Sequence, residues 1–195
     1  MIVPMGRDEE ARLLTLSHAE RLAEEMRARG LRVKVDAREK ESPGFKYNHW
    51  EMRGVPVRVE LGPRDLEVGT AILARRHDGE KETTPLDAVV NRCVELQEEI
   101  QKALYDRALA FREANTHRVD TWDEFVAAFP GEGGGGFVLA HWDGTQETED
   151  LIGAETKTSI RCLPLEALAP EDNEPGVCVK SGRPSPRRVL FARAY

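Results

Sequence analysis

The side chains best suited to binding chemistry lie between residues 43 and 66, on a predicted helix and the strand that follows it. Tyr47 and Glu51 are four residues apart and therefore share one face of the helix. Arg58 and Glu60 share one face of the strand, and apolar residues occupy its other face. Aromatic rings beside guanidinium and carboxylate groups are what unstacked RNA bases bind. The cluster therefore indicates a site for RNA bases.

Arg64 and Asp65 extend this cluster beyond a rigid Gly-Pro corner at residues 62–63. Each residue also has a simpler interpretation, namely a solvated face with salt bridges and Trp50 packed in the core. That interpretation is the better one for any single side chain. It explains the whole cluster less well, because so many complementary groups fall within one short segment.

Other kinds of site receive little support. The glycine run 133–136 lies between a predicted helix and a strand, whereas a phosphate cradle needs a strand followed by a helix N-terminus, so a surface loop is predicted. Cys162 and Cys178 lack the close cysteine partners of a structural zinc site, and Cys93 lies on an apolar helical stripe as a small hydrophobe would. The five histidines have no spacing that pairs them with a nucleophile.

The elements that must position the cluster form a predicted α/β unit. An apolar strand at residues 2–5, a helix that ends at Gly30 and an alternating strand at 31–35 make a βαβ unit. Ser42 and Pro43 fit the start of the next helix. The later elements of this unit are expected at 45–53 (helix), 55–61 and 70–74 (strands), 81–84 (a strand that closes a hairpin through Asp78-Gly79) and 86–113 (a long helix).

The remainder of the chain is predicted to form a second unit, with the boundary between residues 115 and 116. A short helix opens at residues 120–124, and strands are expected at 137–141, 159–163 and 188–192. A helix is expected at 145–154, and a loop rich in proline and acidic residues at 168–176.

Composition limits the function classes. The chain has 195 residues, 40% of them hydrophobic, and a formal net charge of −7, which argues against a polyanion binder held by bulk charge. No apolar run approaches the roughly 20 residues of a membrane span, and the N-terminus lacks the pattern of a secretory signal. Three cysteines suit a reducing compartment, so a cytoplasmic protein without membrane contact is expected.

The segment 43–66 resembles the anticodon-binding domain of prolyl-tRNA synthetases of the archaeal and eukaryote-like type. The shared pattern is Pro-Gly-aromatic-Lys-aromatic, then Trp-Glu, Gly-Val-Pro and Glu-aliphatic-Gly-Pro-basic-Asp, and the likeness extends through residues 107–112 to the ending at 189–195. The resemblance implies a three-layer anticodon-binding domain with a mixed sheet, joined by a long helix to a smaller α+β C-terminal domain that is similar to the family's zinc-binding domain.

The resemblance also implies a ligand and roles for five residues. The proline anticodons carry two guanines, whose Watson–Crick edges offer two N–H donors and a carbonyl acceptor. Glu51 and Asp65 are expected to accept from guanine edges, Arg58 and Arg64 to supply donors, and Tyr47 to provide a stacking surface. The implied partner is tRNA(Pro).

The second unit departs from the family pattern at the zinc site. Zinc-bearing members carry two cysteine pairs, where this chain has Trp142, Asp143 and Thr148 at the first pair and only Cys178 at the second. One thiolate does not make a four-ligand site. We therefore expect a metal-free domain and no cofactor in this chain.

The chain also lacks the catalytic domain that the family places upstream and that binds ATP and Mg²⁺. Alone it should be inactive, as the C-terminal part of a larger, homodimeric ligase whose catalytic domain is its partner. An alternative is a freestanding RNA-binding or regulatory protein derived from the domain. A further alternative is an interaction module in which residues 43–66 make only ion pairs. An upstream reading frame that continues into a catalytic domain would favour the ligase over both alternatives.

Overall fold

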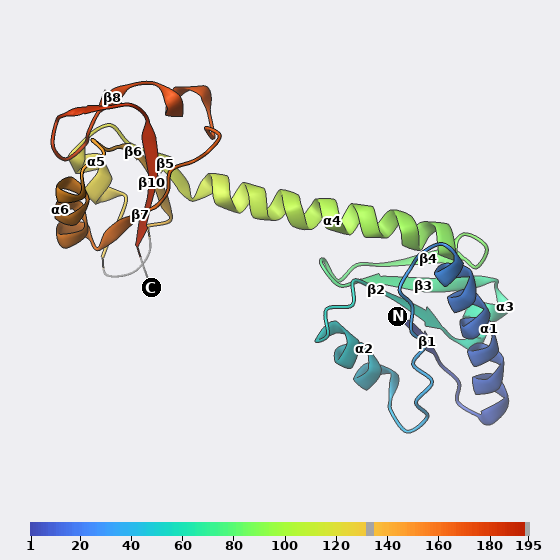
Figure 1. Ribbon diagram of the computed structural model, residues 1–195. Helices are drawn as coiled ribbons and strands as arrows, with labels where there is room; N and C mark the ends of the chain where they lie inside the picture. The colour runs from blue at the N-terminus through green and yellow to red at the C-terminus, as the bar shows by residue number, and fades with distance from the viewer. Residues whose placement is uncertain (132–134, 194–195) are drawn as a thin grey trace. The chain divides into compact units, whose positions relative to one another are not determined.

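The computed structural model describes residues 1–131 and 135–193, and it contains two compact units (Figure 1). The first unit runs from Met1 to Asp106, and the second begins at Arg107. The division falls inside one long helix, α4 (Val89–Ala114). The boundary expected between residues 115 and 116 lies just after this helix and stays a prediction.

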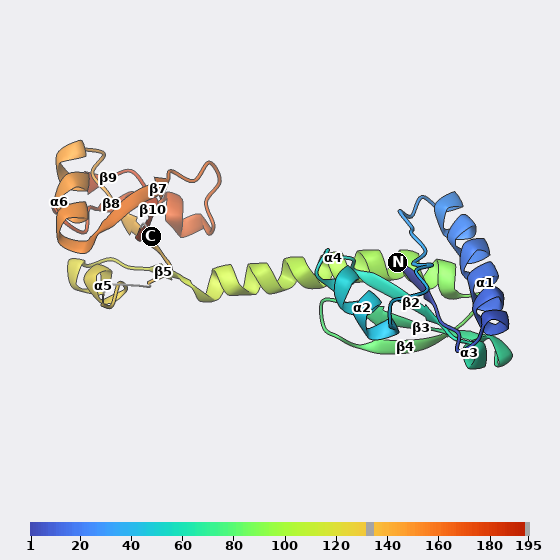
Figure 2. The same ribbon diagram turned by 90° about the horizontal axis from the view of Figure 1, so that it is seen from below.

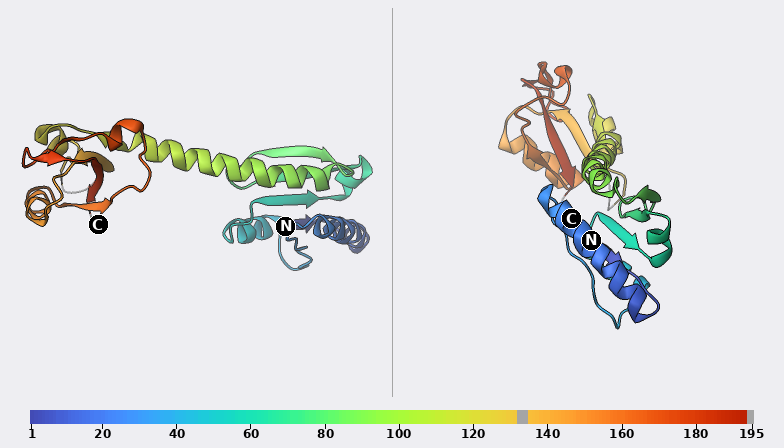
Figure 3. Two further views of the ribbon diagram at one scale, coloured as in Figure 1. Left: turned by 45° about the horizontal axis from the view of Figure 1, so that its top comes forward. Right: turned by 90° about the vertical axis from the view of Figure 1, so that its right-hand side faces the viewer.

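The first unit is built on a four-stranded mixed sheet, which is seen from further directions in Figures 2 and 3. Its strands lie in the order β1 (Ile2–Pro4), β2 (Val57–Leu61), β3 (Thr70–Arg75) and β4 (Lys81–Pro85). β1 pairs with β2 in parallel, and the other neighbours are antiparallel. The predicted strands of this sheet are confirmed, with ends that differ by one or two residues.

Helices α1 (Glu9–Ala28) and α4 share one hydrophobic core with the sheet. Leu22 and Met26 of α1, Val59 of β2, and Cys93 and Leu96 of α4 are buried in this cluster. Burying a large aliphatic side chain contributes about 1.5–3 kcal/mol, so this face accounts for much of the unit's stability. The core location confirms the prediction that Cys93 acts as a small hydrophobe, and burial raises the pKa of its thiol to about 11.

The segment 31–35 is not a regular strand, contrary to its alternating pattern. Only Val35 makes a bridge, parallel to Ile2, with hydrogen bonds from the Ile2 amide to the Lys34 carbonyl (2.9 Å) and from the Asp36 amide to the Ile2 carbonyl (2.9 Å). Residues 31–34 form no further bridge.

The apolar stripe of α4 is buried only in its first half. Its residues up to Ile100 lie in the core, whereas Leu104 and Phe111 are exposed. The apolar stripe of α4 therefore continues beyond the part of the helix that packs in the core.

The second unit contains another four-stranded mixed sheet. Its strands are β5 (Thr116–Arg118), β6 (Phe137–His141), β10 (Arg188–Arg193) and β7 (Thr158–Cys162), in that spatial order. β5 and β6 are parallel, and β10 is antiparallel to both β6 and β7. Helices α5 (Trp122–Ala127) and α6 (Gln146–Thr156) share a hydrophobic core with this sheet. Phe125 of α5, Ile152 of α6 and Phe191 of β10 are fully buried in it.

Smaller elements complete the second unit. A 3-10 turn, η1 (Pro170–Asn173), lies in the predicted loop, and β8 (Gly176–Val177) pairs with β9 (Pro184–Ser185). β5, β8 and β9 were not predicted, because strands of two or three residues leave no periodic signal. Part of the predicted glycine loop, residues 132–134, lies outside the described residues. Among the helices of the described chain, none is both long and apolar enough to cross a membrane.

Candidate functional site

Arg58 is at the centre of the predicted base-binding cluster. Its side chain is 9% exposed, and it donates from Nη1 to Glu51 Oε1 (2.5 Å) and from Nε to Glu60 Oε1 (3.0 Å). The guanidinium carbon lies 4.0 Å from the centre of the Tyr47 ring, which is a cation–π contact. The structure thus brings together three of the five predicted site residues, namely Tyr47, Glu51 and Arg58.

The local sequence explains how the helix presents two of these groups. α2 (Pro43–Glu51) begins where the Ser42 hydroxyl accepts from the Phe45 amide, and Pro43 occupies the first turn, as predicted. Gly54, in the left-handed region at φ +78°, follows the end of the helix. Tyr47 and Glu51, one turn apart, both reach the same Arg58 on β2.

Sequence reasoning placed Glu60 on the same strand face as Arg58 but missed its ion-pair partner, Lys81. Glu60 is 5% exposed, and Lys81 Nζ donates to both of its carboxylate oxygens (2.9 and 3.1 Å). Arg58 is opposite Ala74, and Ala74 is opposite Lys81, so the hairpin register places the two cations in one row on the sheet. The sequence feature that could have indicated this pairing is the Asp78-Gly79 turn, because the turn fixes the register of β3 and β4.

Tyr47 is held at its hydroxyl by Met5 and at its ring by Arg58. Its hydroxyl donates to Met5 Sδ (3.0 Å), and the Met5 amide donates to the Leu61 carbonyl (2.8 Å). Burial first, and then the nearby charge of Glu60, raise the pKa of Tyr47, which keeps the phenol neutral at physiological pH. The ring is therefore a fixed, uncharged aromatic surface.

Arg64 and Asp65, expected beyond the Gly-Pro corner, lie on a short helix, α3 (Pro63–Glu67), which was not predicted. Asp65 Oδ2 accepts from the Gly62 amide (2.8 Å), so the carboxylate caps the first turn of this helix. Its charge contributes to the raised pKa of Tyr47, which links it electrostatically to the cluster. Arg64 is exposed, and among the described residues it has no salt bridge.

A second network fixes α2 from its other side. Asp36 accepts from Trp50 Nε1 (2.7 Å) and from Arg38 Nη2 (2.6 Å). The hydrogen bonds from Arg38, opposed by burial and helped by Trp50, hold the pKa of Asp36 well below its usual range. Trp50 is half-buried at this edge of the unit, and buried Lys46 donates to the Asp36 carbonyl (3.2 Å). Lys46 therefore has a structural role.

In the second unit, hydrogen-bonded side chains lie where the resemblance led us to expect the remains of a zinc site. Asp143 accepts from Ser181 Oγ (2.7 Å), Thr148 Oγ1 (2.9 Å) and Thr145 Oγ1 (2.8 Å). Nearby, the Cys178 sulfur accepts from the Ser181 amide (3.5 Å). Within residues 1–131 and 135–193, no group of three or more His, Cys, Asp or Glu side chains could hold a metal ion. One thiolate and a carboxylate saturated by hydroxyl donors do not fit zinc.

Two family models match successive parts of the chain. Residues 1–96 match the model described as "Anticodon binding domain". Residues 122–195 match the model described as "Prolyl-tRNA synthetase, C-terminal". The first match covers the sheet of the first unit, α2 and the Arg58 cluster, and the second covers the part of the second unit from α5 onward, which contains Asp143.

Curated relatives align with the whole chain. The proline–tRNA ligase of Porphyromonas gingivalis is 45% identical over 195 residues, that of Cytophaga hutchinsonii 44% and that of Amoebophilus asiaticus 41%. Each alignment covers 100% of this chain and 38% of the relative, so the chain spans less than half the length of these relatives. The chain therefore corresponds to the anticodon-binding and C-terminal region of the prolyl-tRNA synthetases.

Proposed function

We propose that this chain binds tRNA(Pro) and recognises the two guanines of its anticodon, as the anticodon-binding part of a proline–tRNA ligase. The observation that carries the proposal is the arrangement of Glu51, Arg58 and Tyr47 on one face of the anticodon-binding unit. It combines an exposed carboxylate, a buried guanidinium that holds it, and a fixed aromatic ring. The similarity to the proline–tRNA ligases supports the choice of tRNA.

Glu51 has the chemistry to accept from a guanine edge. The side chain is 48% exposed, and one carboxylate oxygen is already held by Arg58. A carboxylate matches the adjacent N1–H and N2–H donors of guanine, which adenine, cytosine and uracil do not present together. Because Arg58 restricts the side chain before RNA arrives, less conformational entropy is lost on binding.

Arg58 acts mainly by positioning in this proposal. Its guanidinium is committed to Glu51 and Glu60, and it lies against Tyr47. Asp65 is proposed to serve the second guanine, with Arg64 as the exposed donor beside it. Stacking on Tyr47 would contribute about 1–3 kcal/mol per base.

Binding to altered transcripts tests the proposal. The Kd of the chain for a tRNA(Pro) transcript is compared with its Kd for transcripts in which each anticodon guanine is replaced by adenine. A weakening of about 5- to 150-fold per replacement is expected, since one bidentate contact is worth about 1–3 kcal/mol. Equal Kd values for all transcripts would show that the cluster does not recognise the anticodon.

The wider assignment rests on the same region. We propose that the two units belong to a ligase of the archaeal and eukaryote-like type, with a three-layer anticodon-binding domain joined through α4 to the C-terminal domain. The catalytic domain, with ATP and Mg²⁺, would be a separate part of the same cytoplasmic and homodimeric enzyme. The 38% coverage of the relatives is consistent with such a missing part.

We further propose that the second unit is stable without zinc. Asp143 links the start of α6 to the turn that contains Ser181, so the network joins the segments that cysteine pairs would join in zinc-bearing members. Metal analysis of chain purified without a His-tag tests this. The proposal predicts less than roughly a tenth of an equivalent of bound zinc per chain. One equivalent per chain would contradict it.

A further inference from the structure

Arg76 lies at the proposed guanine site and has no role in it so far. It follows the last residue of β3, and its Nε donates to the backbone carbonyl of Glu51 (2.8 Å) at the end of α2. Arg58 on β2 is opposite Ala74 on β3. The Arg76 amide continues this pairing by donating to the Pro56 carbonyl (2.9 Å). Because alternate residues of a strand share a face, Arg76 is on the same face of the sheet as Arg58.

The other cations of the site are already paired with carboxylates. Nη1 of Arg58 contacts Glu51, and its Nε and Nη2 contact Glu60. Lys81 Nζ donates to both carboxylate oxygens of Glu60. Arg76 is exposed, and its Nη1 and Nη2 have no hydrogen-bond or salt-bridge partner in the part of the chain that the structure describes. Its terminal nitrogens are therefore the donors that remain for a ligand at this site.

The space between these side chains is the size of one exocyclic atom and not of a whole base. Glu51, Arg58 and Arg76 line a cleft of about 40 Å³. One water molecule takes up about 30 Å³ in the liquid. Guanine carries the carbonyl oxygen O6 beside its N1–H, so a base that donates to the Glu51 carboxylate presents O6 next to the same side chain. The proposed function assigns no donor to that oxygen.

We infer that Arg76 donates through a terminal nitrogen to O6 of the guanine held by Glu51, and is thus a second specificity-determining residue of that site. The inference rests on the proposed function and adds the donor that it lacks. Adenine carries an amino group in place of O6, so an arginine donor there would face another donor. The bond from Nε to the Glu51 carbonyl holds the guanidinium beside the carboxylate before RNA binds, which limits the entropy lost on binding.

Replacement of a single atom in the RNA tests the inference. 6-Thioguanosine keeps N1–H and the N2 amino group but has sulfur, a weak hydrogen-bond acceptor, in place of O6. It is placed singly at each of the two anticodon guanines, and Kd is measured for the 195-residue chain and for Arg76→Ala. At one position the sulfur should weaken binding to the wild-type chain by about 5-fold or more and leave binding to Arg76→Ala unchanged. Inosine at that position, which lacks only the N2 amino group, should weaken binding to both proteins.

Other roles of Arg76 predict other results. An arginine that contacts only a phosphate would leave the sulfur penalty equal in wild type and Arg76→Ala, and this would overturn the inference. An arginine that only positions Glu51 would make the sulfur and inosine penalties disappear together in Arg76→Ala, which would overturn it as well. The absence of a sulfur penalty at both positions in the wild-type chain would overturn it without any variant.

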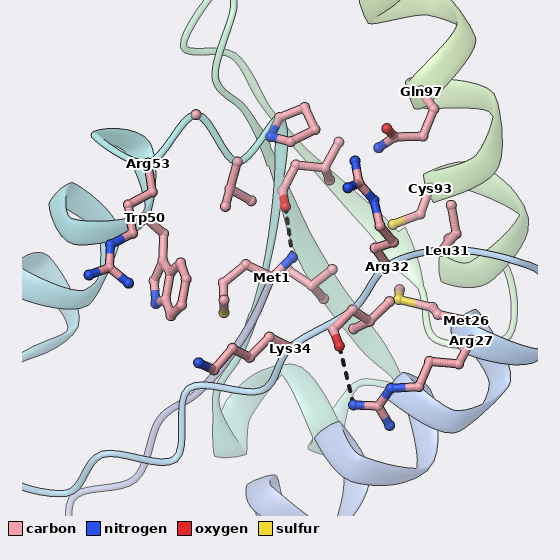
Figure 4. Close-up of a pocket in the computed structure, with 16 residues that line it drawn as sticks. Met1, Met26, Arg27, Leu31, Arg32, Lys34, Trp50, Arg53, Cys93 and Gln97 are labelled. Atoms are coloured by element: carbon pink, nitrogen blue, oxygen red, sulfur yellow. Dashed lines mark hydrogen bonds between the residues drawn. The ribbon is translucent and has the colours of Figure 1, made fainter.

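Arg53→Ala is the matched control, because it removes another exposed arginine close to Glu51. The Arg53 side chain lies beside the Trp50 indole, with its guanidinium carbon 5.5 Å from the ring centre (Figure 4). Arg53→Ala should keep the wild-type sulfur penalty, and loss of that penalty in the control would overturn the inference. A wild-type chain that binds guanine and adenine transcripts equally would contradict the proposed function itself. Guanine preference with any of the overturning sulfur results would contradict the role of Arg76 alone, so the two failures are distinguishable.

Discussion

Replacing Asp143 with Asn removes the charge that holds two segments of the second unit together. The side chain is 2% exposed and accepts hydrogen bonds from Ser181, Thr145 and Thr148. Burial raises the pKa of Asp143, but these hydrogen bonds outweigh it and lower the pKa from 3.8 to about 2. A difference of nearly two pKa units corresponds to about 2 kcal/mol in favour of the charged form in the folded state.

The asparagine has nearly the shape of the protonated acid, so Asp143→Asn should cost the second unit a similar amount, about 2 kcal/mol of opening free energy. The three cysteines provide the assay. Cys178 is buried in the second unit, Cys93 is buried in the first, and Cys162 is exposed. When a thiol reagent reacts more slowly than the unit recloses, its rate at a buried cysteine follows the population of the open form.

Labelling of Cys178 should therefore be about 30-fold faster in Asp143→Asn, the factor that corresponds to about 2 kcal/mol. Labelling of Cys93 should be unchanged, since it lies in the other unit, and Cys162 should react rapidly in every variant. Asp150→Asn, at an exposed position of α6, is the charge-matched control. A change of less than about threefold at Cys178, or an equal change in the control, would refute the reasoning.

Three other outcomes follow from the same contacts. Asp172→Ala should destabilise the second unit by about 1.5–3 kcal/mol in urea unfolding, because Arg118 donates to both oxygens of the buried carboxylate (2.8 and 2.9 Å) but is itself partly exposed and can be hydrated after the loss; retained stability would contradict this. The pKa of Asp36 is lowered by its hydrogen bonds to Arg38, so its contribution to stability is present above the unfolded value near 3.8 and is lost as the pH falls below it. The fluorescence of Trp50 in a variant without Trp122 and Trp142 should report that loss, and an Asp36→Asn variant should lack this pH dependence. Arg58→Ala should weaken tRNA(Pro) binding without changing its salt slope, because Arg58 positions Glu51 and contacts no phosphate, and it should also destabilise the first unit by leaving buried Glu60 with Lys81 alone; unchanged binding would count against a role for Arg58.

Much of the first unit could be predicted from sequence because its signals are local. The Ser42-Pro43 start of α2, the alternation along β2 and the i, i+4 spacing of Tyr47 and Glu51 each depend on a few neighbouring residues. The segment 31–35 was predicted wrongly as a strand, because alternation indicates which side chains are buried and not which backbone groups find a pairing partner.

The missing parts of the site depend on contacts that are distant in the chain. Glu60 and Lys81 are 21 residues apart and meet only through the register of three strands. The short helix at Arg64 and Asp65 was missed because five residues are too few to show a helical repeat.

Recognition of a guanine by Glu51 is tested most directly by a double-mutant cycle between protein and RNA. In the transcript, each anticodon guanine is replaced singly by inosine, which lacks only the N2 amino donor. In the protein, Glu51 is replaced by alanine. At one of the two positions, inosine should weaken binding to the wild-type chain by about 5-fold or more and leave binding to Glu51→Ala unchanged. Equal losses for both proteins at both positions would contradict guanine recognition by this carboxylate.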